Sequence, residues 1–148
     1  VTDGDRCISP SDFGFHNAIV DADGQYYFID FEYAGWDDPA KLVCDFFCQK
    51  AVPVPLSHFR MFISQLSGML SLSNQHQDVI ALLLPVYQIK WCCIVRNEFL
   101  PAGQARRTFA TGEPDQREAQ LAKARAAHAA LTDYTACRDD FLGASKMD

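Results

Sequence analysis

Two short apolar segments near the amino end precede a series of apolar patterns with helical spacing. Residues 18–20 and 26–29 are apolar, and the segment between them contains Asp23-Gly24, a pair typical of β-hairpin turns. The pattern therefore predicts a hairpin over about residues 17–31.

Four helices are predicted after the hairpin, at about residues 38–50, 56–71, 75–99 and 114–141. Asp38 offers an N-cap oxygen and Pro39 suits the first helical position, so the first helix should start there. Pro85 should kink the third helix or split it in two. Because helices outweigh strands, the predicted fold is α+β and mainly α, in a single domain of 148 residues.

The hairpin is expected to bring two polar side chains together. If Asp23 and Gly24 form a two-residue loop, Asn17 lies directly opposite Asp30, with Cβ atoms about 5 Å apart. A three-residue loop would shift the register by one residue and make the pair diagonal. Amide and carboxylate oxygens are suitable ligands for a hard cation such as Mg²⁺. Asp12, five residues before Asn17, completes the outline of a phosphoryl-transfer site.

The order of these residues resembles a known family. The chain has an aspartate, Asp12, five residues before Asn17, then a hairpin and the sequence Ile-Asp-Phe-Glu. This order is similar to the catalytic and metal-binding loops of aminoglycoside phosphotransferases and choline kinases, within the protein-kinase-like superfamily. The Gly-x-x-Asp-Pro segment at residues 35–39 and the aromatic-basic segment at residues 87–91 are similar as well. The resemblance is specific between residues 11 and 45.

The resemblance implies a role for each of these side chains. Asp12 would be the catalytic base, and Asn17 and Asp30 would be the Mg²⁺ ligands. Asp45, on a predicted buried helix, would support the catalytic loop by accepting its backbone N–H groups. The expected reaction is transfer of the γ-phosphate of ATP or GTP to a hydroxyl of a small molecule, such as an aminoglycoside, an amino alcohol or a sugar.

The resemblance also implies how the chain is organised. It matches only the large, carboxy-terminal lobe of a kinase-like fold, with a catalytic loop, one hairpin and about four to five helices. Residues 1–35 would hold the catalytic and metal-binding loops, and residues 36–148 would form a helical subdomain. Since no Gly-x-Gly-x-x-Gly motif is present, we expect the nucleotide-binding lobe to be absent and the isolated chain to be inactive.

Two residues depart from the family pattern. Pro10 stands where the family usually has histidine, and Gly14 stands where it usually has a histidine or basic residue, while His16 lies next to Asn17. These departures leave open a second interpretation, a pseudokinase-like module that binds a ligand or a partner without catalysis. Taken alone, Asp12 could also be an ordinary turn residue and Asp30 a strand-end acid.

Charge and cysteine content exclude several classes of function. The net charge of −6 disfavours nucleic acid and anionic membranes as partners. The six cysteines fit free thiols in a reducing cytoplasm, with Cys44 and Cys48 as buried apolar residues, because a zinc site including His58 would lack a fourth ligand. The apolar segment 80–95 is shorter than a membrane span.

A possible substrate rim follows Asp30. Its members are Glu32, Trp36, Asp37 and Asp38. Acidic side chains attract cationic acceptors, and an aromatic face can bind a quaternary ammonium group. Solvated turn residues would give the same pattern, so a neutral hydroxylated metabolite fits equally well.

Overall fold

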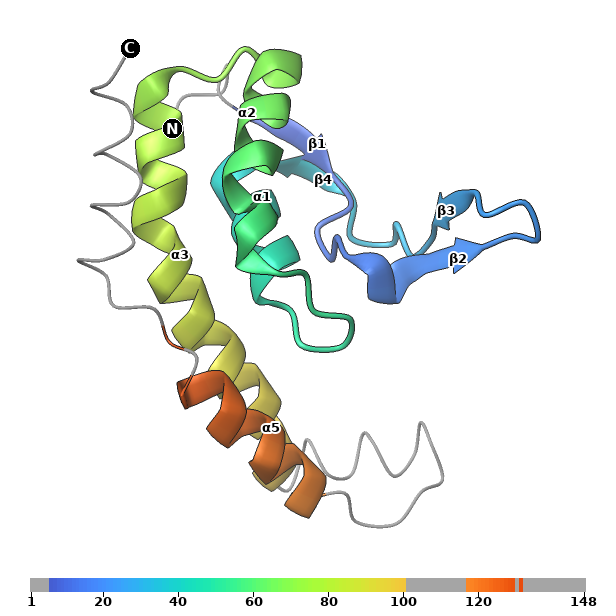
Figure 1. Cartoon of the computed structure of the whole chain (residues 1–148), viewed down its shortest axis with the longest axis vertical. Helices are drawn as coiled ribbons and strands as arrows, with labels where there is room; N and C mark the ends of the chain where they lie inside the picture. Colours follow the sequence, from blue (N-terminus) through green and yellow to red (C-terminus); the bar gives the residue numbers. More distant parts are fainter. Residues whose placement is uncertain (1–5, 101–116, 130, 132–148) are drawn as a thin grey trace.

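Four α-helices and two small antiparallel sheets form the part of the chain that the structure, a computed structural model, describes: residues 6–100, 117–129 and 131. The helices are α1 (Pro39–Cys48), α2 (Phe59–Leu70), α3 (Asn74–Val95) and α5 (Arg117–Ala129). Single 3-10 turns occupy Phe15–Asn17, Leu56–His58 and Arg96–Phe99. The expectation of a mainly helical α+β fold is confirmed, and Figure 1 shows α1 and α2 lying beside the upper half of α3.

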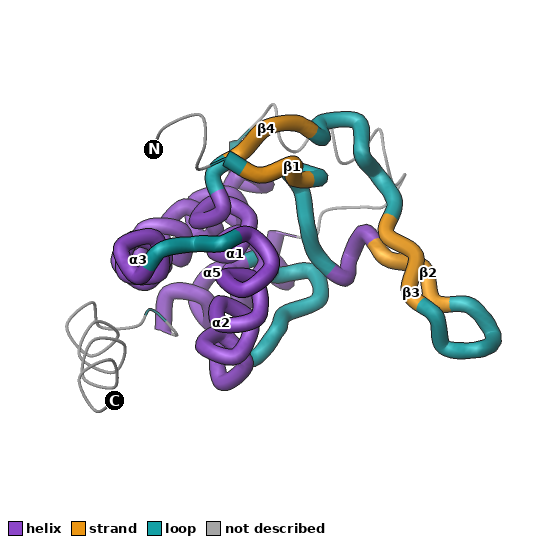
Figure 2. The backbone as a smooth tube through the Cα atoms, turned by 90° about the horizontal axis from the view of Figure 1, so that it is seen from above, coloured by secondary structure: helices purple, strands orange, loops and turns teal. Residues whose placement is uncertain are grey.

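The two sheets contain two strands each. Strand β1 (Cys7–Ser9) pairs with β4 (Gly35–Asp37), and β2 (Ala18–Val20) pairs with β3 (Tyr26–Phe28). Figure 2 shows the β2–β3 hairpin projecting away from the helices, while β1 and β4 lie close to them. The sequence pattern predicted the hairpin but not β4, because three residues are too few to show a strand period.

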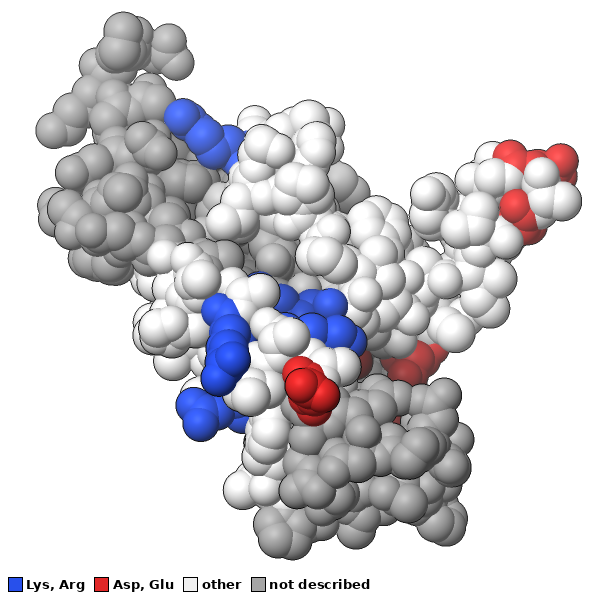
Figure 3. Space-filling view, turned by 60° about the horizontal axis from the view of Figure 1, so that its bottom comes forward, with Lys and Arg blue, Asp and Glu red and all other residues white. Residues whose placement is uncertain are grey.

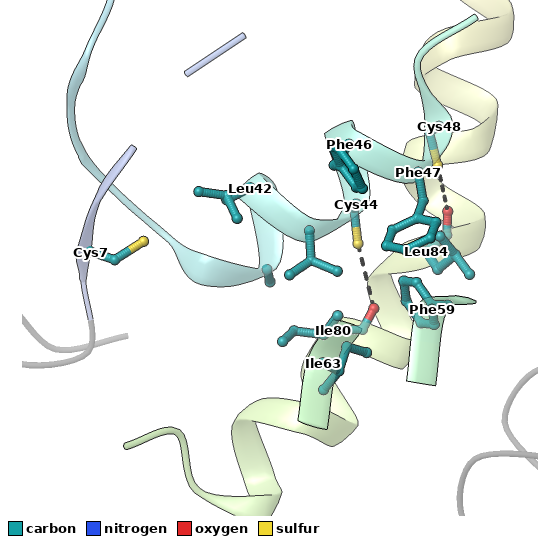
Figure 4. Packing of buried hydrophobic residues seen from close by; sticks show 12 residues of the cluster. Cys7, Leu42, Cys44, Phe46, Phe47, Cys48, Phe59, Ile63, Ile80 and Leu84 are labelled. Atoms are coloured by element: carbon teal, nitrogen blue, oxygen red, sulfur yellow. Dashed lines mark hydrogen bonds between the residues drawn. The ribbon is translucent and has the colours of Figure 1, made fainter. Parts of the chain in front are cut away.

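Helix α1 forms the centre of the core. It begins as predicted, with the Asp38 carboxylate accepting a hydrogen bond of 2.8 Å from the Ala40 N–H. The thiols of Cys44 and Cys48 donate to the carbonyls of Ile80 and Leu84, at 3.5 and 3.9 Å (Figure 4). The two thiols are one helical turn apart on α1, and the two carbonyls are one helical turn apart on α3. The two helices therefore make the same contact at two successive turns. Burial raises the pKa of the Cys48 thiol to about 12, and the prediction that Cys44 and Cys48 are buried without a disulfide is confirmed.

Helix α3 covers most of the predicted third helix. It runs through Pro85 as one helix of 22 residues, so of the two outcomes expected for Pro85, a kink or a split, the split is wrong. By length and composition alone α3 could cross a membrane, and it is the one helix of the described residues that could. A mostly buried core helix passes the same test. In α3, Ile80 and Leu84 are buried against α1, while 22% of the apolar window as a whole is buried.

An aromatic cluster joins the loops to the helices. The ring of Phe13 lies 4.9 Å from that of Phe28 on the hairpin and 5.0 Å from that of Phe46 on α1. Phe46 in turn stacks on Phe62 of α2 at 5.0 Å. Offset and edge contacts of this kind favour a fixed mutual orientation. The residue next to Asp12 is therefore packed against both the hairpin and the helical core.

The hairpin closes with a three-residue loop rather than the two-residue loop first considered. The Asp21 N–H donates to the Gln25 carbonyl at 3.0 Å, which leaves residues 22–24 in the loop. The Asp21 carboxylate accepts from the N–H groups of Asp23 and Gln25, both at 2.9 Å, and these bonds lower its pKa, most of all the bond from Gln25. The side chain of Asp21 thus selects the longer loop.

The register shifts by one residue as a result. Ala18 lies opposite Phe28, and the Ile29 N–H donates to the Asn17 carbonyl at 2.8 Å. The expectation that Asn17 lies directly opposite Asp30 is wrong. Asp30 follows the residue that pairs with Asn17, as expected for the three-residue alternative.

We expect Gly24→Ala to destabilise the hairpin by about 1 kcal/mol. Gly24 has a left-handed φ of 79°, and nothing lies within 4 Å of a Cβ placed there, so the cost is one of backbone conformation alone. Amide hydrogen exchange across β2 and β3 measures the effect. Gly24→Asn, whose side chain tolerates this conformation, is the matched control and should cost less. Equal exchange in the wild-type and alanine proteins would contradict the loop assignment.

The remaining helix predictions are confirmed where the structure describes them. The predicted helix 56–71 corresponds to a 3-10 turn followed by α2, and the third helix is followed by the 3-10 turn at Arg96–Phe99. Of the predicted helix 114–141, α5 forms most of the first half, and Leu131 is not helical. The other residues of that prediction, and the loop predicted before it, lie outside the described residues.

Candidate functional site

Asp12 lies on the short loop that follows β1, residues 10–14, here called the Asp12 loop. Ser11 has a left-handed φ of 68°, and its N–H donates to the buried Ser9 hydroxyl at 3.0 Å. The Asp12 N–H donates to the Pro10 carbonyl at 2.9 Å. These bonds fix the backbone, while the side chain of Asp12 is 52% exposed. The loop therefore presents a carboxylate to solvent on a defined turn.

Asn17 ties the Asp12 loop to the hairpin. Its side-chain Nδ2 donates to the Asp12 carbonyl at 2.9 Å, and its own carbonyl accepts from Ile29. Within the described residues, the Asn17 Oδ1 has no hydrogen-bond donor. An amide oxygen next to Asp12 is thus left available for a ligand.

Asp30 lies two residues after the end of β3, on the other side of the hairpin from Asn17. Its φ of 63° is left-handed, a conformation that aspartate adopts more readily than most residues. Asp30 is exposed, and the described residues provide no partner for its carboxylate. The structure therefore places one amide oxygen and one carboxylate near the same end of the hairpin.

The described residues limit the kind of metal ion that could bind here. They contain no group of three His, Cys, Asp or Glu side chains that could hold a metal by themselves. Mg²⁺ needs fewer protein ligands, because it keeps several waters and is completed by substrate phosphates. Asn17 and Asp30 carry oxygen donors of the kind that Mg²⁺ takes.

His16 contacts the Asp12 carboxylate. Its Nε2 lies 3.2 Å from Asp12 Oδ1, and its side chain is 18% exposed. His16 lies in the 3-10 turn at Phe15–Asn17, which folds the chain back toward the Asp12 loop. The i, i+4 spacing of Asp12 and His16 is the sequence signal from which this contact could be found.

Lys41 on α1 hydrogen-bonds the Asp12 loop. Its Nζ donates to the carbonyl and to the hydroxyl of Ser11, at 3.2 and 3.1 Å. The same ammonium group pairs with the Asp37 carboxylate at 2.5 Å and lies 3.9 Å from Asp45. The spacing of Asp37, Lys41 and Asp45, four residues each, is a second signal that the sequence offered. Lys41 links the first helix to the residue before Asp12.

Asp45 has a different role from the one expected. It is 5% exposed, and its Oδ1 accepts from Lys90 Nζ at 2.7 Å and from Trp91 Nε1 at 2.8 Å. None of its bonds comes from the backbone of the Asp12 loop, so the expectation that it accepts those N–H groups is wrong. Helix α3 supplies closer donors, and Asp45 acts on the loop only through Lys41.

The neighbours of Asp45 are aromatic. Lys90 Nζ lies 4.7 Å from the centre of the Tyr87 ring and 5.9 Å from that of Trp91. Burial, followed by the charge of Asp45, raises the pKa of Tyr87 to about 12, so this hydroxyl stays protonated. The aromatic-basic segment at residues 87–91 therefore serves as the partner of the buried acid on α1.

The four residues of the expected rim divide into two pairs. Asp37 pairs with Lys41, and Asp38 caps α1, so both carboxylates have structural contacts. Glu32 is exposed and hydrogen-bonds Tyr33, which raises the pKa of that phenol, and Trp36 is 68% exposed. Figure 3 shows further acidic side chains at the far end of the projecting hairpin, where Asp21 and Asp23 lie. Of the four, Glu32 and Trp36 are the exposed residues.

Comparisons with models of known protein families, with curated proteins and with solved structures find no match to this chain. The chemistry of the site consequently rests on Asp12, Asn17 and Asp30 and on the groups that hold them.

Proposed function

We propose that this chain is the substrate-side lobe of a phosphotransferase that moves the γ-phosphate of ATP or GTP to a hydroxyl of a small molecule. One observation carries the proposal: Asn17 Nδ2 bonds the Asp12 carbonyl at 2.9 Å. This bond joins an exposed acid and a metal-compatible amide in one unit, at the end of the hairpin that also carries Asp30. The resemblance to aminoglycoside phosphotransferases and choline kinases supports the same reaction.

In this proposal Asp12 is the general base. Its exposed carboxylate accepts the proton of the substrate hydroxyl as that oxygen attacks the γ-phosphorus. Asn17 Oδ1 and the Asp30 carboxylate would hold Mg²⁺, which neutralises charge on the phosphate oxygens when bound. Lys41 and Asn17 keep the Asp12 backbone in place, since positioning supplies much of the catalysis in phosphoryl transfer.

The remaining parts of the enzyme are proposed from the resemblance. A nucleotide-binding lobe that precedes the Asp12 loop would hold the α- and β-phosphates, so the chain alone would be inactive. Exposed Glu32 and Trp36 favour a cationic acceptor such as an amino alcohol or an aminoglycoside. The cytoplasm is the location that supplies ATP and keeps thiols reduced.

A second candidate is a non-catalytic, pseudokinase-like module. The observation that favours it is the contact between His16 and the Asp12 carboxylate, together with Pro10 and Gly14 in the Asp12 loop. In such a module Asp12 would serve the local structure of the loop and would not meet a substrate hydroxyl.

Mn²⁺, a paramagnetic substitute for Mg²⁺, tests the metal assignment in the chain itself. We expect millimolar Mn²⁺ to broaden the amide NMR signals of Asn17 and Asp30 before all others. Asp30→Asn should weaken this binding by at least about tenfold, because it removes the only charged ligand.

The matched control is Asp23→Asn at the tip of the hairpin, which should leave the broadening unchanged. Broadening centred on the tip, or the same affinity in Asp30→Asn and wild-type protein, would overturn the metal site.

A further inference from the structure

His16 is held against Asp12 by more than one feature of the structure. Its Nε2 lies 3.2 Å from Asp12 Oδ1, while its other ring nitrogen, Nδ1, is buried and has no hydrogen-bond partner among the described residues. The two nitrogens of one ring thus have different environments. One faces an exposed carboxylate, and the other is buried without a hydrogen-bond partner among the described residues.

Gly14 makes this placement possible. A Cβ at Gly14 would lie 2.6 Å from His16 Nδ1 and 2.7 Å from Cε1, closer than real Cβ contacts allow. Its φ of 173° is extended backbone that any residue adopts, so the glycine is not required by conformation. The absent side chain at this position provides the space that the imidazole ring occupies.

The two ring nitrogens of His16 occupy different places in the site. Nε2 is the nitrogen within hydrogen-bond distance of Asp12 Oδ1, so it is the one placed to donate to the carboxylate. Nδ1 lies on the side of the ring that the absent Gly14 side chain leaves open.

We propose that His16 is the positioning residue for Asp12, an inference that rests on the proposed function. Its Nε2 donates to Oδ1 and leaves Oδ2 for the substrate. The substrate hydroxyl proton then moves to Oδ2. Its oxygen forms the new bond to the γ-phosphorus, and the bond from that phosphorus to the β–γ bridging oxygen breaks, which releases the nucleoside diphosphate. Asp12 later gives the proton to water.

NMR of the chain tests the placement of the His16 ring. A Cβ at Gly14 would lie 2.6 Å from His16 Nδ1, so Gly14→Ala should displace the ring from Asp12 and shift the His16 ring signals and the Asp12 side-chain signals together. The matched control is Gly35→Ala, since a Cβ at Gly35 meets nothing within 4 Å. Unchanged His16 and Asp12 signals in Gly14→Ala would overturn the proposal.

Kinetics tests the role in protein that carries both lobes. His16→Leu removes the donor at similar size and should lower kcat about tenfold or more, with the KM for nucleotide unchanged. His16→Gln, which keeps an N–H near the Nε2 position, should recover much of the loss. If the role of His16 were purely structural, His16→Leu and His16→Gln would have the same kcat.

The two proposals fail in different ways. Full turnover in His16→Leu would overturn the role of His16 and leave the phosphotransferase proposal standing. No turnover in the wild-type protein with any hydroxyl acceptor would overturn both.

Discussion

Asp45→Ala is expected to lower the free energy of unfolding of the chain by about 3 kcal/mol. The carboxylate is 5% exposed and accepts two short bonds, from Lys90 Nζ at 2.7 Å and from Trp91 Nε1 at 2.8 Å. Removing it leaves both donors without their acceptor and opens a space between α1 and α3. Lys90 is 42% exposed and can turn toward water, which keeps the loss near the lower end of the range for buried pairs.

Urea unfolding followed by circular dichroism measures this difference. The matched control is Asp78→Ala, the same substitution at an exposed position of α3, which should change the free energy by no more than about 0.5 kcal/mol. Equal midpoints for the two variants would show that the Asp45 network does not stabilise the fold.

The effect of Asp45→Ala should reach the Asp12 loop. Lys41 lies 3.9 Å from Asp45 and donates to the Ser11 carbonyl and hydroxyl, so the network runs from α3 through α1 to the residue before Asp12. The stability of the core and the geometry of the candidate site are thus carried by the same charged side chains. Substitutions on α3 can alter the site without contacting it.

Local signals allowed the first helix to be predicted closely. Asp38 and Pro39 act on the adjacent backbone, so neither depends on distant parts of the chain. The loop between the strands of the hairpin was harder to predict, because Asp23-Gly24 suits both a two-residue and a three-residue loop. The Asp21 carboxylate settles the choice by accepting two backbone N–H groups, a contact that pattern alone does not rank.

Contacts between residues that are distant in the sequence could not be predicted from the pattern of apolar and polar residues. Asp45 and Lys90 are separated by 45 residues, and only the packing of α1 on α3 brings them together. The pairing of β1 with β4 has the same origin. Pro85 leaves α3 unbroken because a long helix packed along its neighbour can tolerate one missing N–H. Tertiary packing decided each of these features.

The candidate site was predictable in part. Asp12, Asn17 and Asp30 could be selected from type and spacing, and the structure links the first two directly through a hydrogen bond. The supporting residues, His16 and Lys41, were missed although each follows an acid by four residues. Spacing of this kind is common on helical surfaces, so it identifies a contact only once the turn or helix is known.

Asp12→Asn is expected to lower kcat roughly 10²- to 10⁴-fold in protein that carries both lobes, the range for loss of a general base. Asparagine has the same size but cannot accept the substrate proton. Its Oδ1 can still accept from His16, and the side chain of Asp12 is 52% exposed, so the fold should be unaffected. The KM for nucleotide should change little, because Asp12 is not proposed to bind the phosphates.

The measurement is steady-state transfer of radiolabelled γ-phosphate, with Asp23→Asn as the matched control on the exposed hairpin tip. Asp23 has the same chemistry and exposure but lies in the loop at the far end of the ladder. If turnover in Asp12→Asn equals that of the control, Asp12 is not the base. The loop would then have only a structural role, as the non-catalytic module requires. A loss confined to Asp12→Asn, with unchanged unfolding midpoints in both variants, separates chemistry from stability and leaves proton transfer at Asp12 as its cause.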